Sequence, residues 1–203
     1  SRSQVRRCLE EIDFVERREQ LELELRQQRA LREAFRQGAR PFRVIPQVQN
    51  WLAQFAGLQE PGAPGNPSRQ KFLVLTGRSG TGKTEFAISL GSNALVVPCQ
   101  GAPQPNMTAF RRPQHDIVVF DEIHWRVIAQ CKSLFMGHRE PTCLGQSVCM
   151  QSAYYVWTWG IKMVCCMNDW LHGAKEEEQP DIEWLVAIAI VVDVSTPLWL
   201  DEP

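Results

Sequence analysis

The sequence lacks the features that mark secreted and membrane proteins. Its seven cysteines form no Cys-x-x-Cys pair and show no zinc-like spacing with the four histidines. An odd number of cysteines without such spacing argues against a disulfide framework and indicates buried thiols in a reducing compartment. No signal peptide is visible, and no apolar stretch reaches the length that spans a membrane. We therefore expect a soluble intracellular protein.

The chain also lacks an excess of charge of either sign. Its formal net charge is −1 over 203 residues, and 44% of the residues are hydrophobic, which is ordinary for a globular core. Any nucleic acid would therefore have to bind through a local basic stripe or an assembled ring. The length predicts one domain with an appendage or two small domains. The first residue is Ser, and we interpret the chain as a piece of a longer product.

The clearest motif is a glycine-rich octapeptide, Gly77-Arg78-Ser79-Gly80-Thr81-Gly82-Lys83-Thr84. It fits the phosphate-loop pattern Gly-x-x-x-x-Gly-Lys-[Ser/Thr], and it lies between an apolar run of strand length (71–76) and a helical pattern (85–90). Its glycines let the backbone approach phosphates, and its amides supply an anion site. The motif predicts a nucleoside triphosphate as ligand, and a glycine-rich turn without a ligand is the alternative.

Two side chains of this loop carry specific predicted roles. Lys83 is expected to reach the β- and γ-phosphates, and Thr84 offers a hydroxyl to Mg²⁺, a cation that prefers oxygen ligands. The candidate nucleotide-binding residues are Gly77, Ser79, Gly80, Thr81, Gly82, Lys83 and Thr84.

A second motif, at residues 116–122, is an apolar strand that ends in two adjacent carboxylates, the arrangement known as Walker B. Asp121 can hold Mg²⁺, usually through water, and Glu122 can orient and deprotonate the water that attacks the γ-phosphate. An acidic pair on the surface after a strand is the alternative. The order and separation of this motif and the phosphate loop favour the functional interpretation.

Three further apolar segments predict strands at residues 94–97, 161–167 and 187–194. The second of them ends in Asn168, whose polar side chain could touch the γ-phosphate or the attacking water. Without the phosphate loop and the acidic pair, Asn168 would be interpreted as a turn residue. The longest apolar stretch, 184–192, is better explained by a buried strand than by a membrane helix.

The N-terminal part is predicted to be helical. Residues 3–37 are dominated by Arg, Glu, Gln and Leu, with an apolar face of imperfect register, so a coiled coil, a helical hairpin and a solvated helix all stay open. Residues 47–55 form a short amphipathic helix whose apolar face must pack on something. A Pro/Gly-rich linker follows. We predict a helical oligomerisation segment at 1–56, the linker at 57–69 and a nucleotide-binding domain at 70–203.

Between the second motif and Asn168, the pattern predicts a helix at residues 126–136 and a β-hairpin at 142–159 with its turn near 151–153. Four aromatic residues crowd the second arm: Tyr154, Tyr155, Trp157 and Trp159. They could stack on the bases of a single strand, but packing of the hairpin on the domain is an equal alternative.

The phosphate loop, Asp121-Glu122 and Asn168, in this order, resemble the superfamily 3 helicases. More closely, residues 41–199 resemble the helicase half of the rolling-circle replication initiators (Rep proteins) of circular single-stranded DNA viruses and their relatives integrated in eukaryotic genomes. The stretches that carry this closer resemblance are 46–51, 85–91, 120–122 and 167–168.

The resemblance implies an α/β fold of the AAA+ phosphate-loop NTPase kind. Its five-stranded parallel sheet would place the Asn168 strand between the loop strand and the Asp121 strand. It also implies ATP and Mg²⁺ as cofactors, with Lys83 and Thr84 on the phosphates and the metal, Asp121 and Glu122 serving metal and water, and Asn168 as the sensor. The partners implied are further copies of the chain in a ring, commonly a hexamer, and single-stranded nucleic acid, DNA rather than RNA, held by the hairpin.

Three features depart from that family. No His-hydrophobe-His motif is present and the only tyrosines lie in the hairpin, so we expect no DNA nicking by this chain. Residues 151–153 carry no basic side chain, which weakens the predicted grip on DNA. No arginine follows Lys162, so the family's arginine finger has no counterpart, and Arg111, Arg112, Arg126 and Arg139 are unranked substitutes.

We therefore weigh more than one function. The leading hypothesis is an ATP-driven helicase or translocase, and its rival is a nucleotide-binding assembly module that binds ATP without unwinding. A GTPase or small-molecule kinase is a weaker hypothesis, because no Asn-Lys-x-Asp base-reading motif is present and Asp121-Glu122 suits activation of water.

Overall fold

The computed structural model of the protein describes residues 41–58, 69–112, 114–138, 140–146 and 153–200. The chain divides into two compact units, Ser1–Pro41 and Phe42–Pro203. Nearly all described residues belong to the second unit. The predicted helix at 3–37, most of the predicted linker, the hairpin turn and Arg139 lie outside the described residues.

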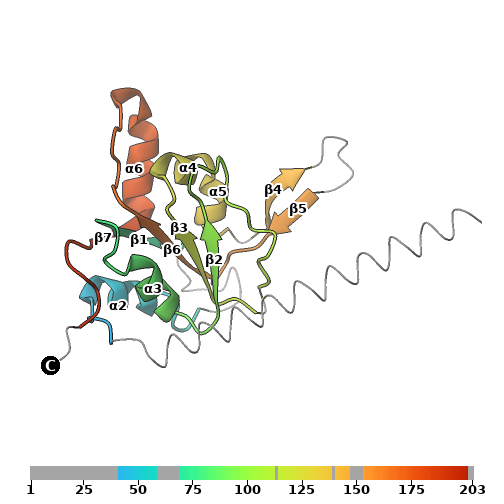
Figure 1. Ribbon diagram of the computed structural model, residues 1–203. Helices are drawn as coiled ribbons and strands as arrows, with labels where there is room; N and C mark the ends of the chain where they lie inside the picture. Colours follow the sequence, from blue (N-terminus) through green and yellow to red (C-terminus); the bar gives the residue numbers. More distant parts are fainter. Residues whose placement is uncertain (1–40, 59–68, 113, 139, 147–152, 201–203) are drawn as a thin grey trace, which may run out of the picture. The chain divides into compact units, whose positions relative to one another are not determined.

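Five parallel strands form the main sheet, in the order β2-β3-β6-β1-β7 (Figure 1). They are β1 (Phe72–Thr76), β2 (Ala94–Pro98), β3 (Ile117–Asp121), β6 (Lys162–Met167) and β7 (Ala189–Asp193). Strand β6, which precedes Asn168, lies between the loop strand β1 and the Asp121 strand β3. The predicted parallel sheet and this strand order are confirmed.

The register of the sheet brings the two motifs and Asn168 to one edge. Asp121, the last residue of β3, is level with Cys166 of β6, and Thr76, the last residue of β1, is level with Met167. Since parallel strands share one direction, the loop after β1, Glu122 and Asn168 all follow the carboxyl edge of the sheet.

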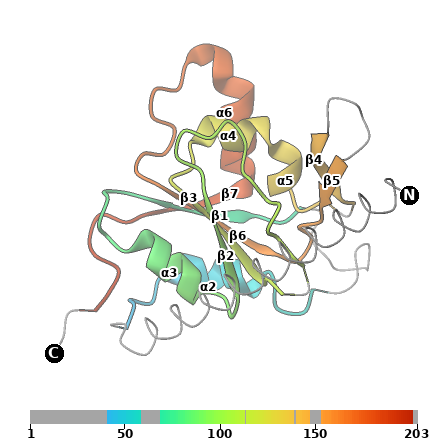
Figure 2. The same cartoon turned by 45° about the vertical axis from the view of Figure 1, so that its right-hand side comes forward.

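Helices cover both faces of the sheet, as Figures 1 and 2 show in two orientations. One face carries α2 (Pro46–Ala53) and α3 (Lys83–Ser89), and the other carries α4 (Trp125–Gln130), α5 (Lys132–Phe135) and α6 (Gln179–Ile188), which follows the short 3₁₀ helix η1 (Glu176–Glu178). Successive residues of β1 alternate between the two resulting cores. Burial on both faces explains why the strands are continuous apolar runs. No helix in the described ranges is long and apolar enough to cross a membrane.

Helix α2 packs on the sheet. Trp51 and Val48 are completely buried, and the Trp51 indole Nε1 donates a hydrogen bond to the carbonyl oxygen of Lys71 at 2.8 Å. The apolar face predicted for residues 47–55 therefore has a partner. The compact unit that contains the sheet begins at Phe42 and includes α2, whereas we placed this helix in a segment ending at residue 56.

Two predicted elements differ from the structure. The helix expected at 126–136 is divided into α4 and α5, because Cys131 (φ −106°, ψ 35°) leaves the helical conformation. The strand expected at 184–192 is wrong in its first half, where α6 continues to Ile188 before β7 begins. There Leu185 and Ile188 are buried while Val186 is 59% exposed, as the spacing of a helix requires.

The predicted hairpin arms are present. Strands β4 (Thr142–Gln146) and β5 (Ala153–Val156) form an antiparallel pair separate from the main sheet, with an irregularity between Cys143 and Gly145. The buried thiols indicated by the cysteine pattern include Cys165 and Cys166, which are both buried in β6.

Candidate functional site

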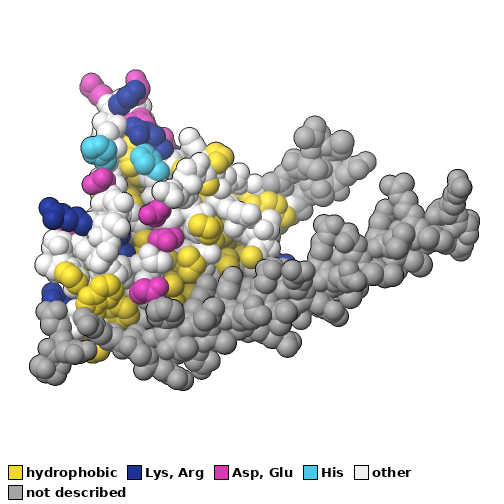
Figure 3. Space-filling model, viewed as in Figure 1, with side chains coloured by type: hydrophobic (Ala, Val, Ile, Leu, Met, Phe, Trp, Pro, Cys, Tyr) yellow, Lys and Arg dark blue, Asp and Glu magenta, His cyan; other side chains and the backbone are white. Residues whose placement is uncertain are grey.

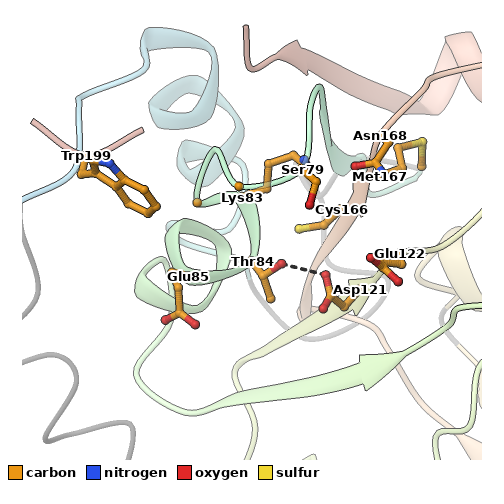
Figure 4. A pocket seen from close by; sticks show the side chains of 12 residues that line it. Ser79, Lys83, Thr84, Glu85, Asp121, Glu122, Cys166, Met167, Asn168 and Trp199 are labelled. Atoms are coloured by element: carbon orange, nitrogen blue, oxygen red, sulfur yellow. Dashed lines mark hydrogen bonds between the residues drawn. The ribbon is translucent and has the colours of Figure 1, made fainter. Parts of the chain in front are cut away.

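A pocket of about 270 Å³ opens at the carboxyl edge of the sheet (Figure 4). Eight of the ten predicted site residues line it, and the remaining two, Gly77 and Thr81, belong to the same loop but not to the lining. Four lining residues were not predicted: Glu85, Cys166, Met167 and Trp199. The loop, the end of β3 and the end of β6 thus surround one cavity.

The backbone of the loop depends on glycine. Gly77, Gly80 and Gly82 all have positive φ, at 139°, 81° and 83°. A Cβ at Gly77 would lie 2.2 Å from the carbonyl oxygen of Val194, and one at Gly82 would lie 2.3 Å from the Trp199 ring. The loop can therefore approach both neighbours only without side chains at these positions.

Lys83 is held inside the loop. Its side-chain Nζ donates to the carbonyl oxygens of Gly77 at 2.7 Å and Arg78 at 2.8 Å, and the residue is 8% exposed. Burial lowers the pKa of this ammonium, and the nearby Asp121 and Glu122 carboxylates act in the opposite direction. An ammonium has three donors, so two bonds to the loop leave one N–H for a ligand in the pocket.

A hydrogen bond joins the two predicted motifs. The Thr84 hydroxyl, in the first turn of α3, donates to Oδ1 of Asp121 at 2.7 Å (Figure 4). A hydroxyl and a carboxylate side by side are oxygen ligands of the kind that Mg²⁺ takes. The described residues contain no group of three or more His, Cys, Asp or Glu that could hold a metal. Mg²⁺ at Thr84 and Asp121 would therefore need phosphate and water oxygens to complete its coordination, which is its usual mode.

Glu122 differs from its neighbour in both backbone and contacts. Its φ of 54° lies in the left-handed region, where a residue with a side chain costs about 1–2 kcal/mol. Its side chain is exposed and has no hydrogen-bond or ion-pair partner among the described residues. Such strain persists where the surroundings enforce it, and it is common at functional sites. The carboxylate is therefore open to a ligand or a water molecule in the pocket.

Asn168 serves the loop through its backbone. Its carbonyl oxygen accepts hydrogen bonds from the Gly77 amide at 3.1 Å and the Thr76 hydroxyl at 3.3 Å, while the residue lines the pocket. The sequence indicated its place at the end of a strand, but not this contact with the start of the loop.

A second pocket of about 270 Å³ adjoins the first. The two share Glu122, Met167 and Asn168, and the second is also lined by His124 and His172. Burial, and to a lesser extent the Arg126 guanidinium, lower the pKa of His124, so this imidazole is mainly neutral at pH 7. The site thus extends beyond Glu122 on the side away from the loop.

Trp199 reaches the pocket from the C-terminal segment. The amide of the preceding residue, Leu198, donates to the carbonyl oxygen of Thr81 at 3.0 Å, and Trp199 forms an antiparallel bridge with Phe42. Nothing in the local sequence marks this residue, because it belongs to no motif and no periodic pattern. Only the tertiary fold reveals it.

The candidate arginines are used within the chain. The Arg126 guanidinium binds the Glu178 carboxylate at 2.5 and 2.8 Å. The Arg112 guanidinium donates to the carbonyl oxygens of Trp157 and Trp159 and lies 4.0 Å from the centre of the Trp157 ring. Arg111 donates to the carbonyl oxygens of Thr108 and Phe110, and none of these three arginines lines either pocket.

Comparison with known proteins adds no family assignment. No protein-family model matches the chain, and no curated protein matches it at a significant level. What is shown is an α/β fold with a five-stranded parallel sheet and flanking helices, an architecture compatible with a phosphate-loop NTPase.

Proposed function

We propose that this chain is the ATP-hydrolysing domain of a helicase or translocase that acts on single-stranded nucleic acid. The observation that carries ATP hydrolysis is the Thr84–Asp121 hydrogen bond, which joins the phosphate loop to the strand-end carboxylates in one pocket. The AAA+ and superfamily 3 assignment and the action on nucleic acid rest on the resemblance of the sequence motifs.

Each side chain of the pocket has a role in this proposal. The loop amides and the remaining donor of Lys83 would bind the phosphates. Thr84 and Asp121 would hold Mg²⁺, which neutralises phosphate charge when it is bound. Glu122 would take the proton of the attacking water, and the Asn168 amide would position that water or the γ-phosphate.

The hairpin offers a limited surface for nucleic acid. Trp159 is buried and Trp157 is covered by the Arg112 guanidinium, so these two rings pack on the domain. Tyr155, by contrast, is 64% exposed and can stack on a base. On the face drawn in Figure 3, basic side chains lie among acidic ones and do not form a stripe. Binding by several copies in a ring would overcome the weakness of each single contact.

A ring would also supply the missing cation. None of the three described candidate arginines lines either pocket of its own chain, so we propose that a neighbouring subunit provides the transition-state cation. Such arginines contribute roughly 10³ to 10⁵ in rate in other phosphate-loop enzymes. Turnover per chain should then rise with protein concentration as rings form.

The test is a steady-state ATPase assay with and without single-stranded DNA or RNA. We expect turnover that single strands stimulate and that Lys83→Ala abolishes, because that variant should bind nucleotide at least about tenfold more weakly, or 1.4 kcal/mol. ATP binding without stimulation would favour the assembly module instead. Unchanged ATP affinity in Lys83→Ala would show that the loop is not the nucleotide site.

A further inference from the structure

The pocket has two chemically different ends. In Figure 4, Asp121, Glu122 and Asn168 lie on one side of Lys83 and Thr84, and Trp199 lies on the other. The first end carries oxygen and amide groups suited to a terminal phosphate and water. The second end is an aromatic ring beside the loop.

We propose that Trp199 is the platform on which the base of the bound nucleotide stacks. The inference rests on the proposed nucleotide site, because it needs the phosphates in the loop. If the terminal phosphate lies toward Glu122 and Asn168, the sugar and base must leave the loop at the opposite end. Trp199 lines the pocket there.

The contact between Trp199 and Gly82 brings the ring close to the path of a ligand. A Cβ on Gly82 would lie 2.3 Å from the Trp199 ring, so the indole occupies the space that any other residue would fill. At Gly82, therefore, no side chain separates the ring from the backbone of the loop. A planar group joined to those phosphates can reach the indole directly.

The backbone that carries the ring is anchored on both sides. Leu198 is buried and bonded to the loop at Thr81, and its carbonyl oxygen accepts from the Arg43 amide at 2.7 Å. Phe42, the bridge partner of Trp199, packs edge-on against Phe86 of α3 with ring centroids 5.4 Å apart. Trp199 itself is only partly buried. A preorganised and partly open ring loses little entropy when a base stacks on it.

This geometry predicts which nucleotides the site prefers. Stacking uses the π-face that every base has, whereas discrimination among bases needs donors and acceptors aimed at their edges. We therefore expect ATP and GTP to bind with similar affinity and pyrimidine triphosphates to bind more weakly, because they stack over a smaller area. Inorganic tripolyphosphate, which has no base, should bind most weakly of all.

The experiment is calorimetric titration of the full chain with the Mg²⁺ complexes of ATP and of tripolyphosphate. Trp199→Ala should weaken ATP binding by about five- to 150-fold and leave tripolyphosphate binding within about twofold. Trp199→Phe should restore most of the ATP affinity. Leu200→Ala, the matched control in the same segment, should change neither affinity, since Leu200 is exposed and outside the pocket lining.

The outcomes separate this inference from the proposed function. Equal weakening of both ligands by Trp199→Ala would mean that the ring shapes the loop, and unchanged ATP affinity would mean that it does not touch the base. Either result overturns the proposal while the nucleotide site stands. If Lys83→Ala weakens neither ligand, the nucleotide site itself fails. Should Trp199→Ala not fold, equal affinity of the unmutated chain for ATP and tripolyphosphate would overturn the stacking role.

Discussion

The two ends of strands β3 and β6 carry similar polar side chains and use them in opposite ways. At the amino ends, the Asp116 carboxylate accepts hydrogen bonds from the Ser92 amide at 3.0 Å, the Asn93 amide at 2.7 Å and the Lys162 ammonium at 3.0 Å. At the carboxyl ends, Asp121 receives one bond, from Thr84, and Glu122 receives none from the described residues.

The difference separates structure from function. A carboxylate whose acceptors are filled by its own protein fixes the fold, and one that stays unfilled at a pocket is available for a ligand. The amino end is closed further by Gly91, where a Cβ would lie 2.2 Å from the Ile117 side chain. Residue type at a strand end therefore does not identify a site, whereas the satisfaction of its hydrogen bonds does.

The largest expected effect on turnover is at the carboxyl ends of β3 and β6. Glu122→Gln keeps the shape of the side chain and removes the base, so ATP should still bind while turnover falls by roughly 10² or more. Nucleotide titration and steady-state hydrolysis measure the two quantities. Hydrolysis at the unmutated rate would remove Glu122 from the mechanism.

A smaller effect is expected at Asn168. Its backbone contact with Gly77 survives replacement by alanine. The variant would lose only the proposed hydrogen bond from the Asn168 amide to the attacking water or the γ-phosphate, worth about 1 to 1.5 kcal/mol or roughly tenfold in turnover. ATP binding should change less. If Asn168→Ala weakens ATP binding as much as it lowers turnover, the role of Asn168 is structural.

A substitution at the amino ends of β3 and β6 should lower stability and leave turnover unchanged. Asp116→Asn removes the negative charge that pairs with the Lys162 ammonium. It also replaces one of the two carboxylate oxygens that accept the Ser92 and Asn93 amides by an NH₂ group. Together these losses should cost about 1 kcal/mol of unfolding free energy and lower Tm by about 2–4 °C. Thermal unfolding and hydrolysis assays check this together. Loss of turnover without loss of stability would contradict the comparison of the two ends.

The pH dependence of that stability is the finest test. Although burial opposes it, the amides of Asn93 and Ser92 and the Lys162 ammonium lower the pKa of Asp116. A carboxyl group whose pKa is lower in the folded than in the unfolded protein stabilises the fold at pH values above its unfolded pKa, which is about 3.9 for Asp. This stabilisation is lost as the pH falls through the pKa of the folded state. In urea unfolding, the difference between the unmutated chain and Asp116→Asn should therefore be full at pH 7 and shrink below pH 4. A difference that is constant with pH would assign the effect to packing.

The part of the site that could be predicted is the part encoded by adjacent residues. The phosphate loop and Asp121-Glu122 are short contiguous strings, and Asn168 directly follows an apolar strand, so spacing alone located them. Trp199 could not be found in this way, because it meets Gly82 only through the fold, from more than a hundred residues further along the chain. The amino-end pairing of Asp116 with Lys162 is hidden for the same reason.

The fold shows the same limit in the final α-β connection. The apolar residues run without interruption from α6 into β7. Their spacing therefore does not reveal where the helix ends and the strand begins. The available signals were the acidic residues 176–178, together with Pro180 and Asp181, which are typical of a helix start. The strand itself was located within two residues at its start, since 187–194 was predicted and β7 spans Ala189–Asp193.

The backbone bonds that attach the C-terminal segment also make it a reporter of the loop. The Leu198 amide donates to Thr81 within the phosphate loop, and the Val194 amide donates to Thr76 immediately before it. Both amide hydrogens can exchange with solvent only when these bonds open locally. A ligand that stabilises the loop should therefore slow hydrogen exchange at Leu198 and Val194, although neither residue would touch it.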